Sequence, residues 1–131
     1  MTDITEKTPE TERPILRAAD LMQFTGTERW FRHALVRDVL HTEGVQYLAE
    51  RGGAYWLIDE IALAQRTVAA VKGEEFQVWT LKVFADRRAS LACEDGNGRS
   101  VHAKTIAFTD FPLEEITLYF TGNVILLPSE Y

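Results

Sequence analysis

Residues 76–84, Phe76-Gln77-Val78-Trp79-Thr80-Leu81-Lys82-Val83-Phe84, mark the point at which the sequence changes character. β-Branched and aromatic residues dominate this stretch, and Trp79, Leu81 and Val83 alternate so that they share one face. Upstream of Gly73, apolar residues instead recur with the period of an α-helix. The stretch therefore predicts a strand, and it separates a helical first part of the chain from a β-rich second part.

The next two strands are expected at residues 89–95 and 99–108, on either side of the turn Gly96-Asn97-Gly98. A three-residue loop pairs Cys93 with Val101 and collects the apolar residues of both strands on one face, whereas loops of two or four residues mix the faces. The sequence therefore predicts a hairpin with a bulged turn, in which the second glycine takes the left-handed conformation.

A second hairpin is expected at the end of the chain, from residues 116–120 and 124–127 around Thr121-Gly122-Asn123. It completes a sheet of roughly five antiparallel strands. Residues 124–127 are apolar, so as an outer strand they would form an exposed sheet edge that favours pairing with a second copy. A homodimer is therefore one expected assembly.

Helical signals precede these strands. Thr42 is expected to cap a helix that ends at Gly52-Gly53, and a second helix follows over residues 54–67. Residues 25–41 fit both a helix and an extended segment, and their pattern does not distinguish the two. These elements predict an α+β fold in which two or three N-terminal helices pack on one face of a roughly five-stranded antiparallel C-terminal sheet.

Length and charge limit the classes of protein. The chain has 131 residues, with 14 Lys and Arg against 20 Asp and Glu, a net charge of −6 that opposes general nucleic-acid binding. We expect a flexible polar tail at residues 1–14 and a single α+β domain at residues 15–131. A single cysteine, no signal-peptide pattern and no apolar run long enough to span a membrane predict a cytoplasmic protein.

Metal and thiol chemistry find little support in the residue spacing. His33, His41, His102 and Cys93 include no pair with metal-ligand spacing, so neither a metal nor another cofactor is expected. Cys93 and His102 are a possible nucleophile and base, but the predicted register places His102 on the opposite face. We therefore expect Cys93 to be a small buried hydrophobe and assign no catalytic residue.

Residues 29–41 form the most basic and aromatic segment. Arg29, Arg32 and Arg37 lie close in sequence to Trp30 and Phe31, a pattern that can bind phosphate and stack a base. Neighbouring acids and the net charge oppose this interpretation. A nucleic-acid-binding module is therefore kept as an alternative function.

An enzyme is the other alternative. Its pocket would lie between residues 25–41 and the helix that carries Asp59, with His33 or His41 as the base. The candidate ligand-binding residues are Trp30, His33, His41, Trp56 and Asp59.

Four stretches resemble a family of small bacterial proteins that is classed as a domain of unknown function and found on mobile elements. They are Phe24-Thr25-Gly26-Thr27-Glu28 with residues 30–33, residues 42–45 continuing through 52–59, residues 111–115, and residues 123–131, which end in Leu126-Leu127-Pro128-Ser129-Glu130-Tyr131. The likeness covers about residues 20–131 and implies no activity. It draws attention to polar and aromatic positions, namely Thr27, Trp30, His33, Thr42, Gly44, Tyr55, Trp56 and Asp59.

The leading hypothesis is a small accessory or binding protein that recognises an unidentified protein partner through an acidic surface or a sheet edge. Its basis is the negative charge together with exposed acids expected near turns of the C-terminal third, namely Asp110, Glu114, Glu115 and Glu130. A membrane partner is not expected.

Overall fold

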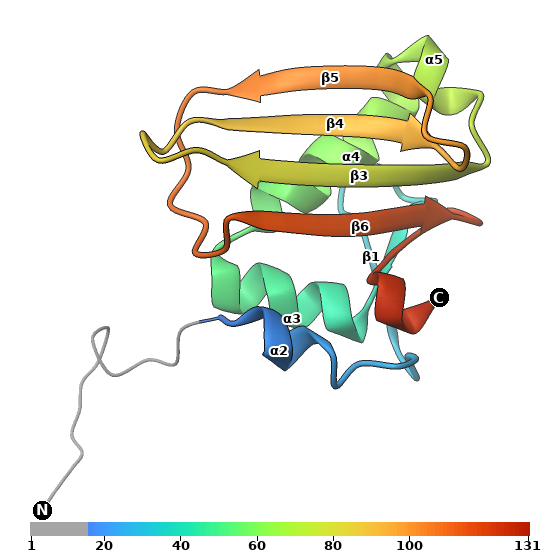
Figure 1. Ribbon diagram of the computed structural model, residues 1–131. Coiled ribbons are helices and arrows are strands. Elements are labelled where there is room, and N and C mark those ends of the chain that lie inside the picture. Colours follow the sequence, from blue (N-terminus) through green and yellow to red (C-terminus); the bar gives the residue numbers. More distant parts are fainter. Residues whose placement is uncertain (1–15) are drawn as a thin grey trace, which may run out of the picture.

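The computed structural model describes residues 16–131 (Figure 1). The tail predicted at residues 1–14 lies outside the described residues. The helices are α2 (Ala18–Leu21), α3 (Glu43–Gly52), α4 (Tyr55–Thr67), α5 (Ala69–Lys72) and the 3-10 turn η1 (Pro128–Glu130). The strands are β1 (Trp30–Arg32), β2 (Leu40–Thr42), β3 (Phe76–Val83), β4 (Ala89–Asp95), β5 (Ser100–Ile106), β6 (Glu115–Thr121) and β7 (Val124–Leu126).

The strands form a mixed sheet of seven strands in the order β1-β2-β7-β6-β3-β4-β5. All neighbouring strands are antiparallel except β2 and β7, which run parallel with Leu40 opposite Val124 and His41 opposite Ile125. The α+β class predicted from the sequence is right, but the five-stranded antiparallel sheet is wrong. The predicted position of the helices is wrong as well, because α3, α4 and α5 lie in the middle of the chain, between β2 and β3.

Residues 25–41 account for most of this error. They fold into β1 and β2, joined by a loop at residues 33–39, and add two short strands to the sheet. β2 pairs with β7, so β7 lies inside the sheet. The homodimer was predicted from an exposed sheet edge at residues 124–127, and β7 is not such an edge. Strands of three residues carry too little periodicity to be distinguished from helix or loop.

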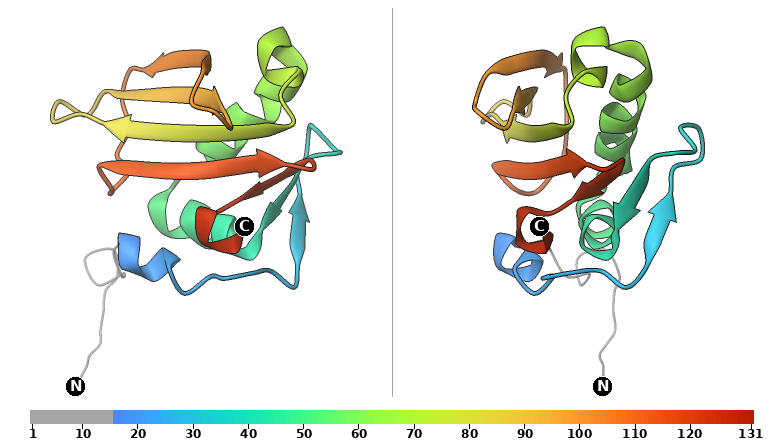
Figure 2. Two further views of the ribbon diagram at one scale, coloured as in Figure 1. Left: turned by 45° about the vertical axis from the view of Figure 1, so that its right-hand side comes forward. Right: turned by 90° about the vertical axis from the view of Figure 1, so that its right-hand side faces the viewer.

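The molecule has two main layers (Figure 2). Helices α3 and α4 cover one face of the sheet, and β1 and β2 continue the sheet around α3. The core fills the space between the layers. Its large fully buried apolar side chains come from both layers and include Leu48, Leu57, Ile61, Trp79, Leu81, Leu91, Phe111, Leu118 and Ile125.

Helices α3 and α4 are confirmed close to their predicted bounds. The Thr42 hydroxyl accepts a hydrogen bond from the Val45 amide at 3.3 Å, and Gly53 ends α3 in the left-handed conformation with φ 62°. The broad apolar arc of α4 is buried because β-strands and α3 both pack on it. No helix within residues 16–131 is long and apolar enough to cross a membrane.

The β4–β5 hairpin has the predicted turn but a different register. Asp95 and Arg99 flank the three-residue loop, and Gly98 has φ 86°. A bulge after Cys93 shifts the pairing, so that Cys93 lies opposite His102 and not opposite Val101. One inserted residue reverses the faces of the strand beyond it, which places His102 on the helix-covered face.

Candidate functional site

The β1–β2 hairpin brings several of the predicted ligand-binding residues against α3 and α4. His33 begins the loop at residues 33–39, and its Nε2 lies 2.7 Å from Oδ1 of Asp59 on α4. A second tie joins this loop to α4, because Arg66 donates to Asp38 at 3.0 Å. Residues 25–41 therefore contact the helix that carries Asp59, whereas the pocket and the ligand-binding role predicted there stay predictions.

The geometry of His33 argues against a role as a general base. Its ring is 6% exposed, and Nδ1 accepts the backbone amides of Leu35 and Val36 at 3.1 and 2.9 Å. Nδ1 is therefore unprotonated, and Nε2 carries the proton that it donates to Asp59. Both nitrogens are occupied, so no lone pair is left to take a proton from a substrate.

His41 belongs to a separate polar chain. Its Nε2 lies 2.7 Å from the Gln46 side-chain oxygen, and the Gln46 amide donates to the Tyr55 hydroxyl at 2.7 Å. Nδ1 is buried and has no partner among the described residues. Burial lowers the pKa of His41, the bond to Gln46 opposes this shift, and the nearby His33 lowers the pKa further. The ring stacks on Phe31 and stays neutral.

Trp30 and Trp56 complete the predicted set. Trp30 is 53% exposed and lies on the outermost strand, opposite Thr42, whereas Trp56 is half-buried on α4 and packs against the core. The cavities described for residues 16–131 are lined by neither these histidines nor these tryptophans. Groups of three or more His, Cys, Asp or Glu that could hold a metal ion are also absent from residues 16–131.

The arginines predicted for nucleic-acid contact are largely engaged within the chain. Arg29 pairs with Glu43 at 3.2 Å and lies over the Phe31 ring, with 5.5 Å from its guanidinium carbon to the ring centroid. Arg32 donates to the carbonyl of Arg37. The carboxylate of Glu43 inside this segment reduces its positive field, which disfavours phosphate binding.

Cys93 is buried, as predicted. The strand register predicted for it is wrong, because Cys93 lies opposite His102. Burial, together with the nearby Glu74, Glu94 and Asp95 carboxylates, raises the pKa of the thiol to about 12. A thiol held neutral in this way is a poor nucleophile. His102 lies opposite it in the ladder, and its ring meets Trp79 edge-on at 6.2 Å between centroids.

Glu130 has a structural role that the sequence did not reveal. It was expected to be an exposed acid, but its carboxylate accepts the Thr42 hydroxyl at 2.6 Å, the Gly44 amide at 3.1 Å and the Leu127 amide at 2.9 Å. It therefore neutralises the amino end of α3. A proline followed two residues later by glutamate, as at Pro128 and Glu130, resembles the pattern that starts a helix. This pattern is the sequence signal that could have indicated the role of Glu130.

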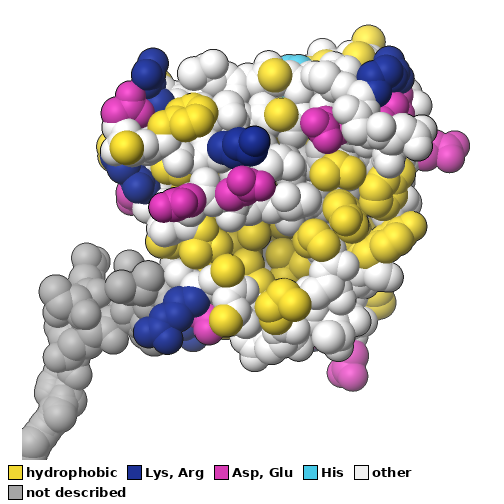
Figure 3. Space-filling view, in the orientation of Figure 1, with side chains coloured by type: hydrophobic (Ala, Val, Ile, Leu, Met, Phe, Trp, Pro, Cys, Tyr) yellow, Lys and Arg dark blue, Asp and Glu magenta, His cyan; other side chains and the backbone are white. Residues whose placement is uncertain are grey.

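Within residues 16–131, no helix covers the sheet face opposite α3 and α4, which we call the uncovered face (Figures 1 and 3). At one end of it, Phe76, Tyr119 and Tyr131 form an aromatic cluster with ring centroids 5.0, 5.3 and 5.7 Å apart. At the other end lies an apolar groove of about 350 Å³, between α2, η1 and the start of β6. Its lining includes Leu21, Met22, Leu113, Ile116 and Pro128.

The fold and these surfaces define an α+β protein with a mixed sheet that helices cover on one face only. The chain belongs to DUF6876, a family of unknown function that matches residues 16–131. No curated protein and no solved structure matches the chain. The predicted membership of a family of unknown function is confirmed, whereas bacterial origin, mobile-element association and a cytoplasmic location stay predictions.

Proposed function

We propose that the chain is a protein-binding module and that its recognition surface is the uncovered face of the sheet. The observation that carries this proposal is the aromatic cluster of Phe76, Tyr119 and Tyr131 on a face that no helix of the described chain covers. Exposed apolar surface next to polar residues is typical of protein interaction sites. Clustered aromatic rings supply most of the binding energy at such sites.

The sheet edges are poorer binding surfaces than this face. β1 has three residues, which offer few backbone groups to an added strand. β5 is longer, but it carries the bulge beside Cys93, and its Lys104 turns inward to pair with Glu60 on α4 at 2.8 Å. Bulges and inward-facing lysines are features that protect an edge from pairing.

Charge on the face supports a partner with basic residues. Glu94 and Glu115 are exposed there, and neither of them forms an ion pair within residues 16–131. Lys82 lies opposite Glu115 in the ladder and offsets only one of the two carboxylates. The face is therefore net negative, and it fits a peptide segment that presents apolar side chains flanked by Lys or Arg.

A random-peptide display library tests the proposal, because it samples many apolar and basic patterns at once. We expect the full chain to enrich peptides with apolar residues flanked by basic ones, and we expect their binding to weaken as salt rises. Tyr119→Ser should reduce the affinity of these peptides about tenfold or more, as expected for loss of a central aromatic. Glu94→Lys should also weaken binding, and as an exposed substitution it leaves the core intact.

Trp30→Ser is the matched control, because Trp30 is an exposed aromatic on the outermost strand, outside the cluster. Unchanged peptide affinity in this variant supports the proposal. Loss of binding in Trp30→Ser but not in Tyr119→Ser would move the site to the β1–β2 region and overturn it. Self-association that Tyr119→Ser abolishes would identify a second copy as the occupant and also overturn it.

A further inference from the structure

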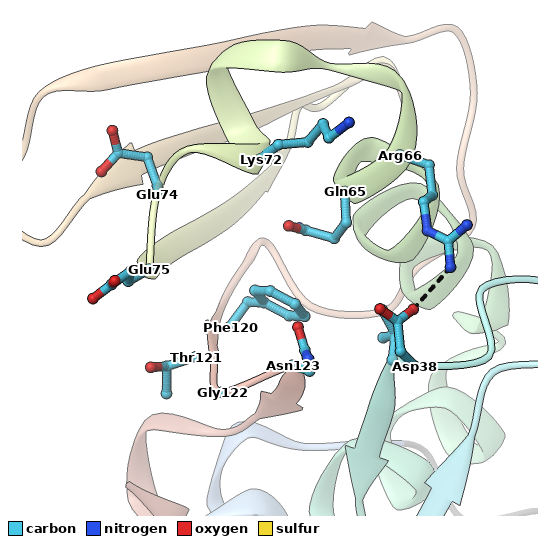
Figure 4. Close-up of a pocket in the computed structure, with 11 residues that line it drawn as sticks. Asp38, Gln65, Arg66, Lys72, Glu74, Glu75, Phe120, Thr121, Gly122 and Asn123 are labelled. Carbon is cyan, nitrogen blue, oxygen red and sulfur yellow. Dashed lines mark hydrogen bonds and ion pairs between the residues drawn. The ribbon is translucent and has the colours of Figure 1, made fainter.

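A second hollow, away from the uncovered face, lies where the end of α4, α5 and the β6–β7 turn meet (Figure 4). Its volume of about 480 Å³ falls within the range of small-molecule pockets, roughly 300–1,000 Å³. Phe120 and Val39 give it an apolar base, and both are at least nine-tenths buried. Polar groups of Gln65 and Asn123 lie beside this base, whereas the Thr121 side chain points away from Phe120.

Two cations face the hollow. Lys72 extends over it toward Arg66, whereas Glu74 and Glu75 on the same rim point away from Phe120. Lys72 has no ion-pair partner within the described part of the chain, and Glu74 is paired with Arg99 at 3.2 Å. The Lys72 ammonium is therefore unpaired, and Glu75, which has no ion pair among the described residues either, points away from Phe120.

Arg66 is held in position by Asp38. Its Nη2 donates to Oδ1 of Asp38 at 3.0 Å, and this bond, followed by a backbone hydrogen bond, holds the pKa of the Asp38 carboxyl below its usual value. Asp38 therefore stays ionised and neutralises one cation. The remaining guanidinium N–H groups are still available as donors, because arginine carries five.

The wall formed by Gln65 is rigid. Gln65 and Gln77 exchange two amide hydrogen bonds, at 2.8 and 3.0 Å, and Gln77 is fully buried. Gln77 also donates to the Val71 and Glu74 carbonyls and accepts from the Trp79 indole. This network fixes α4, the segment after α5 and β3 to one another, so the hollow is preorganised and little ordering entropy opposes binding.

From these observations we propose that the hollow binds a small organic carboxylate, with its charged group between Lys72 and Arg66 and its apolar part over Phe120. The unpaired ammonium of Lys72 and the free N–H groups of Arg66 can both donate to one carboxylate. A phosphate dianion fits less well, because Asp38 and the neighbouring Glu74 and Glu75 would repel its second charge. This site is independent of the proposed peptide surface.

The test is an NMR titration of the full chain with 3-phenylpropanoate, L-phenylalanine, 3-phenylpropanamide and phenyl phosphate. We expect saturable amide shifts at residues 65–72 and 120–123 with the two carboxylates, and weaker binding of the neutral amide and the phosphate. Tighter binding of L-phenylalanine than of 3-phenylpropanoate would show that Asp38 receives the ammonium group and that the ligand is amino-acid-like. Equal binding would identify a simple carboxylate. Both results support the proposal.

Lys72→Gln provides the decisive variant, since Lys72 is exposed and its loss leaves the core unchanged. We expect the affinity for 3-phenylpropanoate to fall about tenfold or more, as for a lost charge-assisted hydrogen bond. Lys82→Gln, an exposed lysine on the uncovered sheet face, is the matched control and should leave the affinity unchanged. Unsaturable shifts, equal affinity for 3-phenylpropanamide, tighter binding of phenyl phosphate, or wild-type affinity in Lys72→Gln would each overturn the proposal.

Discussion

His33 uses both ring nitrogens, one to hold the β1–β2 loop and the other to join that loop to α4. Two backbone amides donate to Nδ1, and Nε2 donates to Asp59. An asparagine side chain can accept amides two and three residues ahead in the same way, since this is the geometry of an Asx turn. Substitutions of His33 can therefore separate its two roles, which are to accept the loop amides and to donate to Asp59.

We predict that His33→Ala lowers the free energy of unfolding by about 1–3 kcal/mol, because two buried amides lose their acceptor. His33→Asn should lose less, since its oxygen replaces Nδ1. Urea denaturation of both variants measures the difference. Equal losses would show that the Asp59 contact, not the loop amides, determines the effect.

His41 predicts a pH dependence of stability. Its folded-state pKa is lowered, chiefly by burial, so the unfolded chain binds the proton more readily. The contribution is complete above the unfolded pKa of about 6.5, and stability decreases as the pH falls below that value, by at most about 1.4 kcal/mol per pH unit.

His41→Phe preserves an aromatic ring on Phe31 and removes the titrating group. We therefore expect its unfolding free energy to fall less than that of the parent chain between about pH 6.5 and pH 5. Urea denaturation at several pH values, with His33 and His102 present in both chains, isolates the effect. Parallel profiles for the two chains would show that His41 does not titrate in this range.

At the scale of elements, Glu130 ties the end of the chain to the start of α3. A Cβ on Gly44 would lie 2.6 Å from Leu127 Cδ1 and 2.9 Å from Glu130 Cδ, so η1 and α3 approach each other too closely for a side chain. Ser129 strengthens the connection by donating to the Phe24 carbonyl at 2.6 Å. Segments more than 80 positions apart in the sequence thus form one packed unit.

We predict that Glu130→Gln lowers the unfolding free energy by about 1–3 kcal/mol, because an amide replaces a charged acceptor of three hydrogen bonds. Gly44→Ala should lower it by a similar amount through overpacking. Thermal denaturation of each variant measures the loss, and Glu94→Gln, an exposed acid whose carboxylate has no hydrogen bond among the described residues, is the control. Wild-type stability in Glu130→Gln would mean that water satisfies the amino end of α3.

At the scale of the whole molecule, Leu16 limits how far the chain can be shortened from its N-terminus without loss of stability. Leu16 is buried, and Gly52 lies close to its side chain. We expect a chain that starts at residue 15 to unfold at the same urea concentration as the full chain. Leu16→Ala in that shorter chain should lower the unfolding free energy by about 2–4 kcal/mol. Destabilisation by the truncation alone would show that residues 1–14 contribute to the fold.

The open sheet face and the hollow depend on the arrangement of the whole sheet. Tyr131 reaches Phe76 and Tyr119 only because β7 and η1 return beside β6, which itself pairs with β3. Lys72 and Arg66 face Asn123 only because β7 passes near the end of α4. Neither surface is visible as a local motif.

The sequence by itself determined the elements with strong local signals. Helices α3 and α4, the β3 strand, the turn at Gly98 and the hairpin of β6 and β7 follow from periodicity, capping and turn residues, which act over a few positions. The parallel pairing of β2 with β7, the bulge that reorients His102, and the hydrogen bonds that Glu130 accepts arise only in the tertiary structure. Each of these depends on contacts between segments distant in sequence, where short strands and single polar residues carry too little local preference to specify a partner.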